Sequence, residues 1–468
     1  MEDPKTGRAL LVQIIDIQFP NLPGLLEDLL RDETEETRIF GEQIDPLQLE
    51  SQIELLLDAR LLLGKIRCSV EQGKVKFDFS WVPSRAHSRI YRVDAEKLIG
   101  FLGLGKKRPI LIGELKGQPL NIDADALDGK LTLILGRKGS GKSHLAKLLI
   151  LGLVEHGAPC LVLDVNGEYT GLGLNRDGTP NRYHAKIKVL KPGKNFKVTL
   201  AYAGKAALNN ILLHVLSTPE NSVREFFRIW NALERLGKIT LKDLRFRLEA
   251  ENLHEQVREA LLSRLGYLER SGFFTDREEE TVKVEEVFSE VEDGGAIILD
   301  LSWCTPLERR MVVEFLLGKL VDLLKVWRLK AVFLFAEEAH LYLRETYWED
   351  VITRMRHLGI FATFITNQPD SIRDEIYRQA DNIFLFNFIN EHDLNAIARV
   401  ARVDHETVKI MAQSLQPGHC MILGHAVREI PLLVKVRELE VKAMGETRTF
   451  FAAEEKLSRE WMVLEKEL

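Results

Sequence analysis

The sequence predicts an α/β protein in which a mainly parallel sheet carries a helical insertion and follows a small β-rich domain. Short strand-like segments separated by turn residues occupy much of residues 1–115. From Leu131 onward, apolar strand-like segments alternate with helical patterns, the order that produces a parallel sheet. Residues 205–292 interrupt this alternation with helical, densely charged sequence. We therefore expect a β-rich domain over residues 1–115, a core over 116–440 with an insertion at about 205–292, and a helical tail over 441–468.

Composition indicates a folded protein without a globally basic surface. The chain has 468 residues, 45% of them hydrophobic, which is enough for large cores and sets a prior of about three domains. Its 70 acidic residues outnumber 64 Lys and Arg, and the formal net charge is −6. A nucleic-acid partner would therefore need a local basic surface, such as the lining of a pore.

The cysteines and the apolar runs exclude other classes of protein. Cys68, Cys160, Cys304 and Cys420 are far apart and form no CxxC pair, so neither a zinc site nor a disulfide framework is expected. No apolar run reaches the roughly 18 residues of a membrane-spanning helix, and the first residues do not resemble a signal peptide. We expect a soluble cytoplasmic protein that does not contact a membrane.

The first domain is expected to be small, β-rich and barrel-like. The predicted strands are Leu10–Phe19, Lys65–Val70, Lys74–Trp81 and Arg89–Val93, and a helix is predicted over Pro46–Leu63.

The first motif of the core is Gly136-Arg-Lys-Gly-Ser-Gly-Lys142-Ser143, which fits a phosphate-binding P-loop at every required position. It follows the strand-like Leu131–Leu135 and precedes a helical pattern, as this motif requires. Lys142 would reach the β and γ phosphates, and the Ser143 hydroxyl would bind Mg²⁺. The alternative is an ordinary glycine-rich turn. The expected nucleotide contacts are Gly136, Lys138, Gly139, Ser140, Gly141, Lys142, Ser143 and His144.

The remaining pattern predicts a RecA-like, doubly wound sheet around this loop. The predicted strands are Cys160–Val165, Ala296–Ser302, Ala331–Glu337, Phe361–Asn367, Asn382–Ile389 and Cys420–Gly424. The predicted helices are Pro306–Arg328, Trp348–His357, Asp370–Arg378 and Glu391–Val400. The tail, Glu446–Leu468, reads as a charged amphipathic helix suited to packing on a neighbouring subunit.

Two consecutive carboxylates end the apolar segment Ala331–Ala336. Burying a strand to its end and finishing it with Glu337 and Glu338 is costly unless a cation or a polarised water meets them. Glu337 is the better candidate for holding Mg²⁺ through water, and Glu338 for orienting the attacking water as a general base. A catalytic glutamate favours hydrolysis over transfer to a second substrate. The alternative is that both carboxylates cap the next helix.

Polar residues also follow two other predicted strands, and ligands of open α/β sheets gather at such carboxyl ends. Asp164 and Glu168 follow one strand; helix capping or a structural ion pair is the alternative for them. Asn367 and Gln368 follow another, where an amide can sense the γ phosphate. Ordinary turn chemistry before Pro369 is the alternative for these two amides.

Arg354 and Arg356 precede the strand that starts at Phe361. A guanidinium there could stabilise the transferring phosphoryl group of a neighbouring subunit's nucleotide and make hydrolysis depend on assembly. An ordinary surface arginine is an equally open alternative.

With these segments placed, the chain resembles the HerA branch of the FtsK-HerA family of hexameric DNA translocases, from about Leu62 to Val436. Beside the P-loop, the motifs that carry the resemblance are Asp164-Val-Asn-Gly-Glu168-Tyr169, Glu337-Glu338-Ala-His340 and Arg356-His-Leu-Gly-Ile360. The chain departs from the family pattern at Val165 and Asn166, which replace Pro and His, and at Met355, which replaces the glycine before the arginine. Asn367 takes the sensor position by alignment, and Gln368 would take it with a one-residue shift.

The resemblance implies a homohexameric ring that uses ATP and Mg²⁺ to move double-stranded DNA through its centre. It also implies a partner nuclease of the NurA type in DNA end processing, or another effector in antiviral defence. A nucleotide-gated ring that only assembles and activates an effector is the rival reading. In this resemblance, Arg356 aligns with the family's arginine, which acts on the neighbouring subunit's nucleotide, and Arg354 is the other candidate for that role. Candidate DNA contacts are Lys186, Lys188, Lys191 and Lys194, for which an ordinary solvated loop is the alternative.

Overall fold

The computed structural model describes residues 1–18, 61–71, 73–77, 81–83, 87–338, 341, 354, 356–388, 397, 405–413, 415–442 and 444. The chain divides into two compact units, Met1–Gly103 and Leu104–Leu468. Several predicted segments fall wholly or mostly outside the described residues: the helix over 46–63, the helices over 348–357 and 391–400, and the tail over 446–468.

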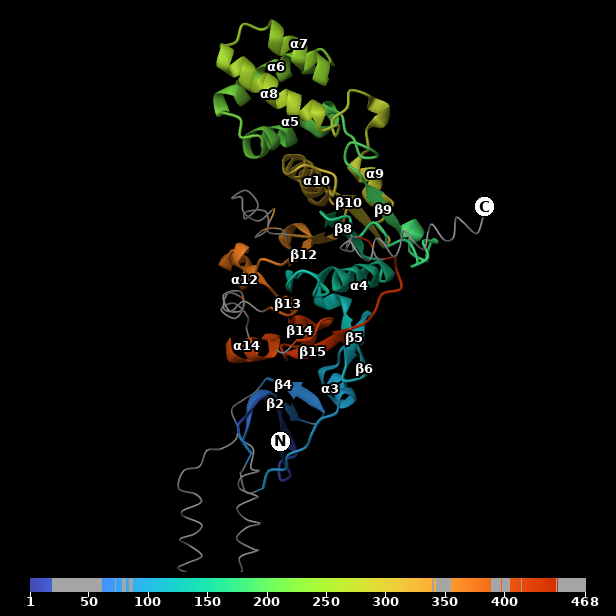
Figure 1. The fold of residues 1–468 in the computed structure, drawn as a ribbon, viewed down its shortest axis with the longest axis vertical. Helices are drawn as coiled ribbons and strands as arrows, with labels where there is room; N and C mark the ends of the chain where they lie inside the picture. Colours follow the sequence, from blue (N-terminus) through green and yellow to red (C-terminus); the bar gives the residue numbers. More distant parts are fainter. Residues whose placement is uncertain are drawn as a thin grey trace, which may run out of the picture. The chain divides into compact units, whose positions relative to one another are not determined.

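The first unit contains a four-stranded antiparallel sheet, as the β-rich sequence predicted (Figure 1). Its strands are β1 (Glu2–Asp3), β2 (Arg8–Gln18), β3 (Leu61–Glu71) and β4 (Lys74–Lys76), in that spatial order, and helix α3 (Ala95–Leu102) follows. Among the described residues, β1 and β4 do not pair to close a barrel. The strand predicted at Arg89–Val93 is wrong, since only Arg89 pairs, through a bridge to Glu2.

The second unit is built on an eleven-stranded sheet, which confirms the predicted α/β fold. The spatial order is β6-β5-β15-β14-β13-β7-β12-β11-β8-β10-β9. The strands from β13 to β9 are all parallel, and β14, β15, β5 and β6 add antiparallel pairs. Their bounds are β5 Pro109–Leu115, β6 Gln118–Asp123, β7 Thr132–Leu135, β8 Pro159–Asp164, β9 Ile187–Leu190, β10 Gly295–Asp300, β11 Val332–Ala336, β12 Ile360–Thr366, β13 Asn382–Leu385, β14 His419–Gly424 and β15 Leu432–Val436.

Burial explains which strands the sequence could predict. Every residue of β7, β10, β11 and β13 is buried, because helices cover both faces of a parallel sheet, and such strands read as continuous apolar runs. Strand β5 pairs with β15 in this sheet. The boundary between the units therefore lies at residue 103, before the expected position at 115.

Helices flank the sheet, and the insertion is helical as predicted. The flanking helices are α4 (Lys142–Glu155), α10 (Pro306–Lys325), α12 (Asp374–Gln379) and α14 (His405–Gln413). The insertion holds α5 (Leu200–Asn210), α6 (Glu220–Arg235), α7 (Leu241–Ala250), α8 (Glu255–Arg270) and α9 (Val284–Ser289), with no strand between β9 and β10 in this described stretch. In Figure 1, α5 to α8 gather beyond α10.

The insertion shares its hydrophobic core with the sheet. The Phe273 ring lies 5.2 Å from Phe196 and 5.4 Å from Phe315 of α10, in edge-to-face contacts. These ring contacts anchor the insertion to the core by packing, in addition to the covalent connection. A capping box of Thr305 and Glu308 fixes the start of α10. In the described ranges, no helix combines the length and apolarity needed to cross a membrane.

Candidate functional site

Sheet order brings four predicted site segments to one edge. Strand β12 lies between β7 and β11, and β8 lies on the other side of β11. Because these strands are parallel, the segments that follow them emerge at the same carboxyl edge. These segments are the P-loop after β7, Asn367 after β12, Glu337 after β11 and the 165–169 turn after β8.

The P-loop backbone adopts the conformations that its glycines permit. Gly141 starts α4 with φ 113°, a left-handed value that other residues rarely adopt. A Cβ on Gly136 would lie 2.6 Å from the Phe386 Cβ, so this position admits no side chain. The first N–H groups of α4 have no partner within the helix, and they can donate to an anion at its positive end. The loop is thus shaped for phosphate.

The remaining predicted nucleotide contacts differ in exposure. Ser140 is buried, and its Oγ has no hydrogen-bond partner among the described residues. Lys138 and Gly139 are exposed. The His144 Nε2 lies 2.7 Å from the Arg437 carbonyl oxygen, and burial lowers the pKa of this histidine. His144 therefore ties the start of α4 to the segment after β15.

Lys142 is a buried cation inside the loop. Only 7% of it is exposed, and its Nζ donates to the Arg137 carbonyl oxygen at 3.1 Å. Burial lowers its pKa, while the nearby Glu337 and Glu338 carboxylates raise it. Phosphate oxygens would replace a neutral carbonyl with an anionic acceptor, which makes a stronger hydrogen bond.

Glu337 is a deeply buried carboxylate of this edge, at 2% exposure. Its Oε1 accepts from the Ser143 hydroxyl at 3.3 Å, and its Oε2 accepts from the Tyr169 hydroxyl. Burial raises the pKa of Glu337 to about 7. A buried carboxylate beside a hydroxyl suits a hard cation such as Mg²⁺, which prefers oxygen ligands. No cluster of three His, Cys, Asp or Glu in the described ranges offers another metal site.

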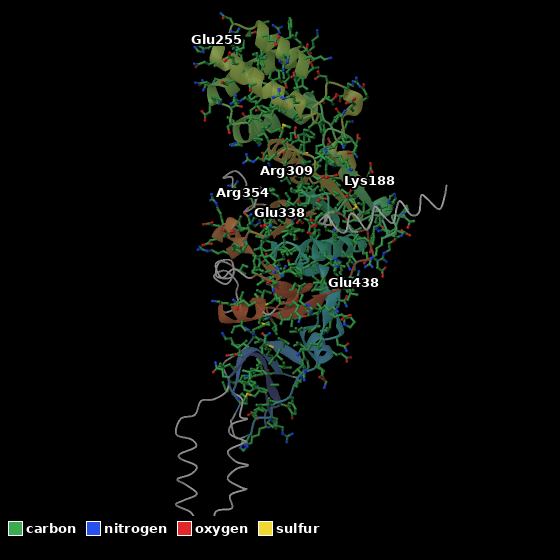
Figure 2. All side chains as sticks on the ribbon, viewed as in Figure 1. Lys188, Glu255, Arg309, Glu338, Arg354 and Glu438 are labelled. Carbon is green, nitrogen blue, oxygen red and sulfur yellow. The ribbon has the colours of Figure 1, made fainter. Side chains whose placement is uncertain are left out.

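Glu338 follows in an uncommon backbone conformation. Its φ of 50° lies in the left-handed region, which is strained for a glutamate. Such strain persists only where the surroundings enforce it, and it is frequent at functional sites. Glu338, labelled in Figure 2, is the second residue after the end of β11.

Asp164 and Tyr169 organise the turn after β8. The Asp164 carboxylate accepts from the Glu168 and Tyr169 backbone N–H groups, each at 2.9 Å. Burial raises the pKa of Asp164 to about 6, and these two hydrogen bonds oppose the shift. The turn presents the Tyr169 hydroxyl to Glu337. Sequence reasoning gave Tyr169 no role of its own; its place after a parallel strand was the available signal.

Replacing Tyr169 with Phe is expected to weaken Mg²⁺ affinity about 10- to 100-fold, because Glu337 loses a donor that orients it. The ring stays buried, so the fold should be retained. The measurement is the Mg²⁺ concentration that half-saturates nucleotide binding. Tyr183→Phe is a matched control, since it removes a hydroxyl that binds Glu155 instead. Equal Mg²⁺ dependence in both variants would remove Tyr169 from the site.

The two candidate sensor amides differ in their surroundings. The Asn367 Oδ1 is buried and has no hydrogen-bond partner among the described residues. The Gln368 side chain is exposed, and its backbone N–H donates to the Thr366 hydroxyl at 3.0 Å. A buried amide oxygen that lacks a partner is costly unless a ligand or water satisfies it. The geometry therefore favours Asn367.

Arg356 does not belong to this edge in its own chain. It precedes β12, whereas Asn367 follows β12, and seven residues of strand span about 23 Å. The Arg356 Nη2 lies 2.5 Å from Asp381 and 3.3 Å from the Gln379 carbonyl oxygen. Arg354 is exposed, and no ion pair of Arg354 occurs among the described residues.

The four candidate DNA lysines do not share one loop. Lys188 lies on the edge strand β9, at the far end of the sheet order (Figure 2), and its ammonium lies 2.6 Å from Glu290. The loop prediction is wrong here because Ile187–Leu190 pairs with β10. Lys191 lies 3.5 Å from Asp300. Lys194 lies 5.3 Å from the Trp303 ring centre, whereas Lys186 is exposed.

Comparisons with known proteins agree with this geometry. Residues 110–320 match the family model described as the central domain of helicase HerA. The chain is 24% identical to the DNA double-strand break repair helicase HerA of Sulfolobus acidocaldarius, over 93% of this chain and 86% of the relative. It is 22% identical to a probable helicase, MJ1565, of Methanocaldococcus jannaschii, over 95% of this chain and 88% of that protein.

Two solved structures share the fold. VirB4 of Thermoanaerobacter pseudethanolicus superimposes with a TM-score of 0.55 at 15% identity, covering 72% of this chain and 98% of that one. The bacterial conjugative coupling protein TrwB superimposes with a TM-score of 0.53 at 14% identity, covering 80% and 99%. The resemblance that the sequence motifs predicted is thus confirmed for both sequence and fold.

Proposed function

Because the chain is a P-loop ATPase of the HerA type, we propose that it forms a homohexameric ring that moves double-stranded DNA through its centre. The position of Arg356 carries this proposal. The arginine lies at the end of β12 opposite to the P-loop edge, about 23 Å away. It can contact a nucleotide only if a second copy brings its own P-loop to that end. Head-to-tail contacts of this kind form a ring when the rotation between successive copies closes.

Each residue of the nucleotide edge then has a distinct task. Lys142 and the N–H groups at the start of α4 bind the phosphates, and Glu338 accepts the proton of the attacking water. Asn367 hydrogen-bonds the γ phosphate and thereby reports its presence. Ser143 and Glu337 would hold Mg²⁺, which neutralises the charge that develops on the phosphate oxygens. Arg356 of the adjacent copy stabilises that charge from the other side.

The proposal extends to the setting of the ring. The Sulfolobus relative is described as a double-strand break repair helicase, so DNA end processing is the setting that we propose here. The ring would act in the cytoplasm and feed DNA to a partner nuclease of the NurA type. The first unit, Met1–Gly103, is the proposed docking part for that partner.

Stimulation of ATP hydrolysis by DNA tests this function. We expect duplex DNA to increase ATP turnover and the protein to displace a protein roadblock bound to that duplex, in an ATP-dependent way. The Lys142→Ala variant is the control, because it loses the phosphate-binding ammonium. A single rate with and without DNA, together with an undisturbed roadblock, would contradict translocation.

One observation favours the rival function, a nucleotide-gated ring that assembles and activates an effector. Lys188 and Lys191 are neutralised within the chain, and the formal net charge is −6. A ring of this kind would bind ATP and its effector but displace no roadblock. The same experiment therefore separates the two functions.

Lys186 provides a direct test of DNA contact. If it touches a DNA phosphate, Lys186→Ala should weaken binding to duplexes of any sequence and reduce the slope of log affinity against log salt by about one. Lys188→Ala is the matched control, since Glu290 already neutralises that ammonium. Affinities are measured over a salt series. Equal slopes for wild type and Lys186→Ala would place this lysine outside the DNA contact.

A further inference from the structure

Asp381 joins Arg356 to the strand that carries the P-loop. Asp381 directly precedes β13, and Leu131 directly precedes β7, the neighbouring parallel strand. The Asp381 carboxylate accepts the Leu131 N–H at 3.0 Å, and the Leu131 carbonyl oxygen accepts the Asp381 N–H at 2.9 Å. The same carboxylate binds the Arg356 guanidinium at 2.5 Å. One buried side chain thus holds both the amino end of β7 and the arginine.

Asp381 is a buried carboxylate with several basic neighbours, among them the half-exposed Arg356. The side chain of Asp381 is only 6% exposed, whereas that of Arg356 is 43% exposed. Lys130 and His425 each lie 3.7 Å from the other carboxylate oxygen. Asp381 can therefore hold Arg356 by its Nη2 atom while the half-exposed arginine faces outward.

We propose that Asp381 is a positioning residue, which holds Arg356 at the amino edge of the sheet in the orientation that reaches the neighbouring copy's nucleotide. The inference rests on the proposed assembly, in which Arg356 acts in trans. It goes further by linking the arginine, through Leu131 and β7, to the P-loop of its own subunit.

Rings that mix two kinds of subunit test which of the two subunits at an interface needs Asp381. One subunit type carries Arg356→Ala and keeps a working P-loop; the other carries Lys142→Ala and keeps the arginine. Turnover then arises only at interfaces that combine the P-loop of the first type with the arginine of the second. Asp381→Asn is added to either type in turn. Asn keeps an oxygen for the Leu131 N–H but loses the charge that binds Arg356.

The expected result is asymmetric. Added to the arginine-supplying subunit, Asp381→Asn should lower the rescued turnover roughly tenfold with an unchanged KM for ATP, because a small displacement of a catalytic group is costly. Added to the P-loop subunit, it should have little effect. In rings of one type, Asp381→Asn should add nothing to Arg356→Ala. Asp374→Asn, which removes an exposed carboxylate in the same segment, is the matched control.

Two other outcomes would overturn the proposal. A loss only when Asp381→Asn sits on the P-loop subunit would show that Asp381 supports its own β7 and nothing more. Equal losses on both subunit types would show a general structural role. If the Asn variant does not fold, Asp381→Glu, which keeps the charge but displaces it, enters the same test with the same expected asymmetry. Absence of any rescue before Asp381 is changed would contradict the trans arginine itself, which is a separate failure.

Discussion

Replacing Glu338 with Gln is expected to lower ATP turnover by about 10²- to 10⁴-fold while ATP remains bound. Gln keeps the size and can still hydrogen-bond a water, but it cannot accept that water's proton. The lysine and the helix terminus that bind the phosphates are unchanged, so affinity should persist. Single-turnover hydrolysis and equilibrium binding of ATP are the two measurements.

Glu168 supplies the matched control for this variant. Burial lowers the pKa of Lys142, and the nearby Glu168 carboxylate opposes that shift, yet Glu168 belongs to the turn after β8. Glu168→Gln should therefore change turnover much less than Glu338→Gln. If the order of the two effects were reversed, Glu168 would be the base and the assignment of Glu338 would fail.

Replacing Arg356 with Ala is expected to lower turnover by about 10³- to 10⁵-fold, the range typical of an arginine supplied in trans. Nucleotide binding should change much less than turnover, because Lys142 and the N–H groups at the start of α4 still bind the phosphates. The ring should still assemble if other contacts hold it. Turnover, nucleotide affinity and the mass of the assembly are measured together.

The Arg354→Ala variant tests whether the loss of turnover is specific to Arg356. It is exposed on the same segment, with no ion pair among the described residues, whereas Arg356 binds Asp381. Arg354→Ala should leave turnover within a few-fold of wild type. Should Arg354→Ala abolish turnover and Arg356→Ala spare it, Arg354 would be the arginine offered to the neighbour and Arg356 its anchor.

The nucleotide edge could be predicted from the sequence because its signals are local. A P-loop needs a strand, fixed glycines and a helix in succession, and two carboxylates directly follow the wholly buried strand β11. Strands β7, β10 and β11 were predictable for the same reason, since burial on both faces leaves a continuous apolar run.

Other features depend on residues far apart in the chain, and no local pattern reveals them. Tyr169 reaches Glu337 across 168 positions, and Asp381 reaches Leu131 across 250. Strand β9 has only four residues, one of them a lysine, so no local pattern distinguishes it from a loop before its pairing with β10 is known. The antiparallel strand β15 joins the large sheet by pairing with β14, and β5 joins it by pairing with β15.

The sensor position shows the limit of a motif match. A one-residue shift decides between Asn367 and Gln368, and both are amides. Only the burial of the Asn367 Oδ1, beside the exposure of Gln368, distinguishes them. Burial at a strand end follows from the neighbouring strands β7 and β11, which the motif does not contain.

The central claim is that each ATP site is completed by a second copy of the chain, and mixing two inactive variants tests it most directly. Arg356→Ala and Lys142→Ala subunits are each expected to hydrolyse almost no ATP alone. When they are mixed and allowed to reassemble, turnover should return, with a maximum at intermediate ratios. Turnover that stays at the background level at every ratio, in assemblies shown to contain both variants, would contradict the account.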